Sequence, residues 1–132
     1  MTHPVSPYMR KMLFADAFVS GAAAILMVAG AGPLGSFLEL PPALLFWAGV
    51  VLFPFVALLI ALATRESAPR LFLLDIVLIN GLWALASIVI LLAGLVTPNV
   101  LGTLFVVAQA LAVALLGALQ FTGLRGTWAE AV

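Results

Sequence analysis

Of the polar side chains that interrupt the apolar stretches of this sequence, six are our candidates for chemistry inside a membrane. An ionisable residue near the centre of a membrane-spanning helix costs roughly 2.5–3.5 kcal/mol on insertion scales, so its presence needs a structural or functional reason. Together they form our candidate intramembrane polar site: Asp16, Asp75, Asn80, Ser87, Gln109 and Gln120.

The two carboxylates lie at shallow depth. Asp16 and Asp75 each follow a basic residue by five positions, and Gln120 precedes one by five. At 1.5 Å rise per residue, each lies about 7–8 Å from its basic neighbour along the helix, so the three form one layer. Two interpretations stay open for the aspartates. They are either a proton or cation relay, or carboxylates satisfied by a nearby Arg or Lys, by Gln120 or by water.

Hairpin geometry predicts which polar groups share a level. If the segments 70–95 and 99–124 fold about a point near Thr97 and Pro98, Asp75 comes level with Gln120, and Ser87 with Gln109. Amide and hydroxyl groups at such depths either line a polar path or form hydrogen bonds between helices, worth about 0.6 kcal/mol each.

Asn80 has a specific predicted partner. If the segments 42–63 and 70–95 fold near Ser67, Asn80 comes level with Pro54. Pro54 has no N–H, so the carbonyl of Val50 loses its helical donor, and the Asn80 amide is predicted to supply one. Trp83 shares a helix face with Asn80, so it is expected inside the bundle, either as a core filler or as a wall on which a ligand stacks.

Four apolar segments are long enough to position these groups. A membrane-spanning helix needs about 20 apolar residues, and spans are predicted at about 12–31, 42–63, 70–95 and 99–124, with residues 32–42 and 96–99 as loops. The continuous apolar runs do not alternate as membrane strands do. Asp16 and the length of the first run favour an uncleaved helix over a signal peptide. We therefore expect one all-α domain over residues 1–132, a four-helix transmembrane bundle.

The basic residues predict the orientation of this bundle. Arg10 and Lys11 precede the first span, Arg65 and Arg70 lie between the second and third, and Arg125 follows the fourth. Short loops rich in Lys and Arg stay in the cytoplasm. Both termini are thus expected there, with a bacterial inner (plasma) membrane as the expected location.

Composition excludes several function classes. Hydrophobic residues make up 66% of the chain and charged residues 8%, against about 25% charged residues in soluble domains, so lipid is an expected partner. The net charge of zero argues against nucleic acid. There is no cysteine, and His3 is the one histidine, so haem, iron–sulfur and thiol chemistry within the spans is excluded. We expect no catalytic residues, no metal and no cofactor, and hence no enzyme.

Two functions from different classes remain. The first is a non-catalytic accessory or interaction subunit that packs against another membrane protein or against itself. The second is a small homo-oligomeric transporter or channel with Asp75, Asn80 and Gln109 along its path. We favour the first. The short loops leave no soluble domain for catalysis or signalling, and the sequence names neither a substrate nor a partner.

Overall fold

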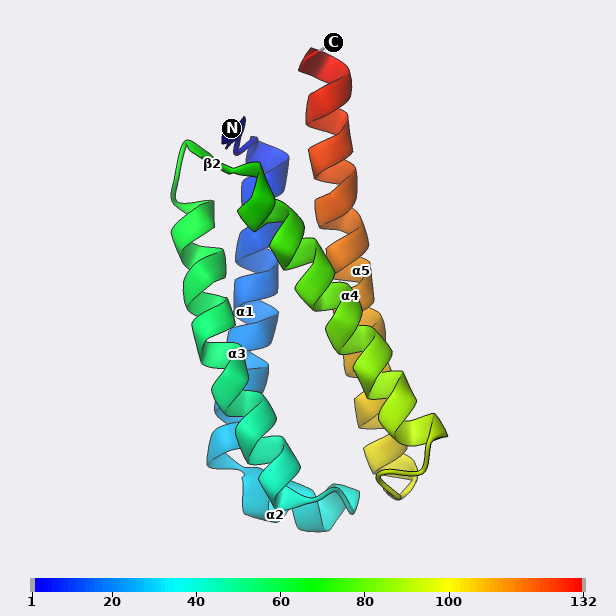
Figure 1. The fold of residues 1–132 in the computed structure, drawn as a ribbon. Helices are drawn as coiled ribbons and strands as arrows, with labels where there is room; N and C mark the ends of the chain where they lie inside the picture. Colours follow the sequence, from blue (N-terminus) through cyan, green and yellow to red (C-terminus); the bar gives the residue numbers. More distant parts are fainter. Residues whose placement is uncertain (1, 132) are drawn as a thin grey trace.

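Four long helices dominate the structure, a computed structural model that describes residues 2–131 and the side-chain surroundings of residues 2–124. They are α1 (Pro7–Ala29), α3 (Pro42–Ala63), α4 (Arg70–Leu92) and α5 (Val100–Ala131) (Figure 1). Each contains a stretch long and apolar enough to cross a membrane. The prediction of four long apolar helices is confirmed, although α1 begins five residues earlier than expected and α5 extends beyond residue 124.

The helices are arranged as two hairpins that meet through one pair of helices. α1 packs mainly against α3, α4 packs mainly against α5, and α1 also contacts α5. α1 begins and α5 ends at the same end of the bundle, which we call the terminus end; the opposite end, which holds α2 (Ala31–Leu38), is the α2 end. α3 and α4 diverge from the terminus end toward the α2 end (Figure 1).

A short strand pair lies outside the spans, at the terminus end. β1 (Thr2–Pro4) pairs antiparallel with β2 (Ser67–Pro69), with His3 opposite Ala68. The Arg10 guanidinium donates to the carbonyl oxygens of Ala63 at 2.8 Å and Arg65 at 2.9 Å. Because the last carbonyls of a helix have no intrahelical donor, Arg10 both caps α3 and ties α1 to it.

The segment predicted as the first loop is largely helical, which corrects that expectation. α1 ends at Ala29, where the Gly30 N–H donates to the Leu26 carbonyl, and α2 begins at Ala31. Pro33 is compatible with α2 because it lies in the first turn, where a missing N–H costs no hydrogen bond. α2 ends at Leu38, because the following residue, Glu39, has a left-handed backbone (φ 56°) that stops the helix.

Asn99 joins the start of α5 to the end of α2. Its Oδ1 accepts from the Gly102 N–H at 2.8 Å, and its Nδ2 donates to the Phe37 carbonyl at 2.8 Å. Gly102 permits this approach, because a Cβ there would lie 2.2 Å from the carbonyl oxygen of Leu38. The two hairpins are therefore connected at the α2 end through backbone contact.

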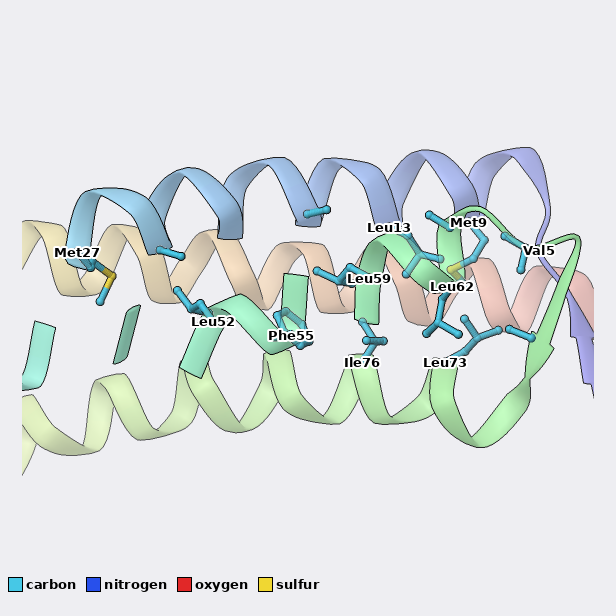
Figure 2. Close-up of a cluster of buried hydrophobic side chains, with 14 of the residues drawn as sticks. Val5, Met9, Leu13, Met27, Leu52, Phe55, Leu59, Leu62, Leu73 and Ile76 are labelled. Carbon is cyan, nitrogen blue, oxygen red and sulfur yellow. The ribbon is translucent and has the colours of Figure 1, made fainter. Parts of the chain in front are cut away.

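A cluster of buried apolar side chains runs between α1, α3 and α4 (Figure 2). Near the terminus end, Leu13, Leu59 and Ile76 from these three helices are completely buried. Lipid is as apolar as these side chains, so in a membrane close packing rather than removal from water holds such helices together. The helices are thus held firmly at the terminus end.

Replacing Gly102 by alanine is expected to destabilise the fold, by about 1–3 kcal/mol, because the added methyl overpacks a backbone contact. Gly81→Ala is the matched control, since a Cβ at Gly81 meets nothing within 4 Å. Thermal unfolding of the purified variants in one detergent measures both changes. Equal unfolding temperatures would contradict the close approach of α2 and α5.

Candidate functional site

Asp16, Asn80 and Gln120 form a hydrogen-bonded ring inside the bundle, which we call the polar ring. The Asn80 Nδ2 donates to Asp16 Oδ2 at 2.7 Å and to Gln120 Oε1 at 3.0 Å. The Gln120 Nε2 donates to the same Asp16 oxygen at 2.8 Å. Each residue comes from a different helix, so the ring joins α1, α4 and α5 at one point.

Ser20 completes the surroundings of the Asp16 carboxyl group. Its hydroxyl, one helical turn along α1, donates to Asp16 Oδ1 at 2.9 Å. Asp16 is completely buried and accepts all three bonds from neutral donors. Both amides present their NH2 groups to the Asp16 carboxyl oxygens, which accept these hydrogen bonds. The set of partners suits a carboxylate that is stabilised by dipoles rather than by a cation.

Helical periodicity and one glycine place these groups together. On α1, the buried side chains recur at Leu13, Asp16, Ala17, Ser20 and Ala24, which is the spacing of one helix face. On α5, Gly117 lies one turn before Gln120, and a Cβ there would lie 3.2 Å from the Asn80 Cβ. The absence of that Cβ lets α4 and α5 approach where the ring forms.

A second set of polar side chains lies farther toward the α2 end and joins α4 to α5; we call Trp83, Ser87 and Gln109 the indole cluster. The Trp83 indole N–H donates to Gln109 Oε1 at 2.8 Å, and the Gln109 Nε2 donates to Ser87 Oγ at 2.9 Å. The Ser87 hydroxyl donates to the Trp83 carbonyl at 2.7 Å. The predicted level of Ser87 with Gln109 is confirmed, and Trp83 does face the bundle.

The indole cluster borders a cavity of about 650 Å³ between the hairpins. Its walls come from α1, α3, α4 and α5, and they include Ser20, Trp47, Trp83 and Gln109. Ser20 also bonds to Asp16, so one side chain connects the cavity wall with the polar ring. Its lining residues on α3 and α4 belong to the halves of these helices nearer the α2 end, where the two helices diverge (Figure 1).

The structure separates Asp75 from the other five candidate residues. Asp75 is exposed on the outer surface of α4, and Gln120 bonds to Asp16 and Asn80 rather than to Asp75. The interpretation in which Gln120 satisfies an aspartate therefore holds for Asp16 and is wrong for Asp75. A common level predicted from the sequence does not bring two side chains together when one of them faces outward, as Asp75 does.

The predicted partner of Asn80 is also wrong. Both hydrogens of its amide are committed to Asp16 and Gln120, so none remains for the Val50 carbonyl. Asn80 faces α1 and α5, whereas Val50 lies on α3, which packs mainly against α1. The sequence contained one usable signal, the shared depth of Asp16 and Gln120, but the role of Ser20 was missed.

No group of three or more His, Asp or Glu side chains able to hold a metal ion occurs among the residues that the structure describes. His3 is buried within the strand pair, opposite Ala68, at the terminus end. Comparisons with protein-family models, with curated proteins and with solved structures find no match. Function must therefore be argued from the geometry.

Asp16→Asn is expected to destabilise the protein by about 1–3 kcal/mol, because an amide nitrogen replaces an acceptor and leaves a buried donor of Ser20, Asn80 or Gln120 without a partner. Asp75→Asn, the same change on the outer surface, is expected to shift stability by less than about 0.5 kcal/mol. Thermal unfolding in detergent compares the two. Similar effects of both changes would show that the polar ring does not support the fold.

Proposed function

We propose that this protein is a small non-catalytic accessory subunit of a membrane assembly, and that it binds its partner through the outer face of α4. Four apolar helices support a multi-pass membrane protein. Four basic residues lie at the terminus end: Arg10, Lys11, Arg65 and Arg70. Their position supports termini on the cytoplasmic side. The compact size and short loops are the basis for proposing a bacterial inner membrane.

The observation that carries this proposal is the position of Asp75. Its side chain faces outward from α4 and makes no hydrogen bond or ion pair with the part of the chain that the structure describes. A carboxylate that faces lipid within a span is costly, and such residues pair with one another or with other polar groups. A partner helix with a basic or other donor side chain at this depth would remove that cost.

The rest of the α4 surface suits a partner helix. Asp75 belongs to a row of exposed side chains at alternating spacings of four and three residues: Leu71, Asp75, Leu78, Leu82, Leu85, Val89 and Leu92. That spacing is the repeat by which two helices interlock side by side, and a single polar residue in such a row sets the register. Gly81 beside it offers open space for close approach.

The alternative function, a homo-oligomeric transporter using Asp75, Asn80 and Gln109, has less support. The three residues have three different surroundings: the outer surface of α4, the polar ring and the indole cluster. The hydrogen bonds of Asn80 and Gln109 are made within their own clusters. A polar path through all three would require both clusters to open.

The proposal predicts a second protein that cross-links to α4. A photoreactive residue at position 78, in the exposed α4 row, is expected to capture a stoichiometric partner in native membranes. The same residue at Leu111, exposed on α5, is the control and is expected to capture lipid only. Asp75→Leu should reduce capture at position 78 by roughly tenfold or more, the effect of losing an interaction with a buried charge.

Retained capture in the Asp75→Leu variant would contradict the assigned role of Asp75. Cross-links from position 78 to this chain alone, in a homogeneous oligomer, would favour the transporter instead. Flux assays on Asp75→Asn in liposomes would then test that function directly, with unfolding temperature as the check that the variant remains folded.

A further inference from the structure

The cavity between the hairpins has the size and lining of a small-molecule site. Its volume of about 650 Å³ falls within the range of roughly 300–1,000 Å³ typical of such sites. Most of the lining side chains are apolar, and the polar exceptions converge from α1, α4 and α5: Ser20, Trp83, Ser87 and Gln109. A few placed polar groups in an apolar cavity select a ligand by its hydrogen-bonding group.

Gln109 has only acceptor capacity left. The Trp83 indole N–H can only donate, so the Gln109 atom that faces it must be the carbonyl oxygen. The Gln109 NH2 group then donates one hydrogen to Ser87 Oγ and the other to the Val106 carbonyl. Both hydrogens are used, whereas Oε1 accepts one bond and retains a lone pair.

The other polar side chains that line the cavity also have no free donor hydrogen. The Ser87 hydroxyl donates its hydrogen to the Trp83 carbonyl, and the Ser20 hydroxyl donates its hydrogen to Asp16. The indole N–H of Trp83 donates to Gln109. Every donor hydrogen on these four side chains is committed, so the cavity offers a ligand acceptors alone.

From this pattern we propose that the cavity binds a neutral, largely apolar molecule that carries a hydroxyl group, and that Gln109 Oε1 accepts the hydroxyl hydrogen. A carbonyl compound of the same shape would find no donor and would lose its hydrogen bonds to water or headgroups on entry. A cation is disfavoured, because the Asp16 carboxylate is completely buried behind Ser20 and does not line the cavity.

The ligand can reach this site from the surrounding lipid. The lining residues Trp47 and Val51 on α3 are 62% and 59% exposed, and Ala86 on α4 is also exposed. The cavity therefore opens on the outer surface of the bundle rather than only toward an aqueous end. This route suits a molecule that is dissolved in the membrane, and none of its residues belongs to the α4 row proposed to bind a partner.

The test compares three molecules of equal chain length: dodecanol, a dodecanone and dodecane. The full-length protein is held in one detergent at increasing mole fractions of each, and thermal unfolding is followed. Dodecanol is expected to reach half of its maximal stabilisation at a mole fraction roughly five- to tenfold below that of dodecanone, the effect of one hydrogen bond. Equal midpoints, or no stabilisation by any of the three, would overturn the proposal.

Two variants separate this selectivity from a general effect of amphiphiles on micelles. Gln109→Leu removes the acceptor and releases the Trp83 indole N–H, so the advantage of the alcohol over the ketone should disappear while both still bind. Ala112→Phe places a ring in the cavity wall and should abolish stabilisation by both molecules. Leu111→Phe, the neighbouring exposed residue outside the cavity, should behave as the unmodified protein.

An alcohol preference that persists in Gln109→Leu would overturn the role of Gln109. Stabilisation that persists in Ala112→Phe would place binding outside the cavity and overturn the site. Because each variant is compared with its own unliganded state, a lower starting stability does not obscure either result.

Discussion

The buried carboxylate of Asp16 is the constraint on which the bundle depends. A completely buried Asp with no cation among its described partners is compatible with the fold only if each oxygen receives hydrogen bonds. Those donors come from α1, α4 and α5, so the requirement brings three helices to one point. Apolar packing alone would let these helices slide or rotate against one another, since lipid competes equally well for their surfaces. The carboxylate supplies the specificity that apolar contact lacks.

This constraint divides the molecule into two unlike parts. Toward the terminus end, the strand pair, the Arg10 cap and the buried side chains of α1, α3 and α4 hold the two hairpins together. Beyond the polar ring, α3 and α4 separate, and a cavity takes the place of side-chain contact. α2 and the Asn99 bridge reconnect the hairpins at the far end. The cavity is thus held open between two anchored ends, as a binding site needs.

The polar residues have correspondingly distinct surroundings. The members of the polar ring form hydrogen bonds with one another, so the ring contributes to the stability of the fold. The indole cluster satisfies its donors but keeps acceptors toward the cavity, which suits recognition of a hydroxyl group. Asp75 makes no hydrogen bond or ion pair with the described part of the chain. It faces outward within the leucine-rich row of exposed side chains on α4. An accessory subunit that binds a partner through α4 and a lipid-soluble molecule through its cavity accounts for all three surroundings.

The sequence by itself determined how far along its helix each polar residue lies. Length, apolar runs and the positions of Lys and Arg predicted four spans with both ends together, because rise along a helix is a fixed 1.5 Å per residue. The same arithmetic brought Ser87 level with Gln109, and those two residues do bond. Tertiary structure alone decided the direction in which each side chain points. Asn80 faces Asp16 rather than Val50, and Asp75 faces outward. Tertiary structure also decided that the bundle is open between α3 and α4. These helices are apolar on every side, so their sequences contain no contrast between faces to indicate which one is inside.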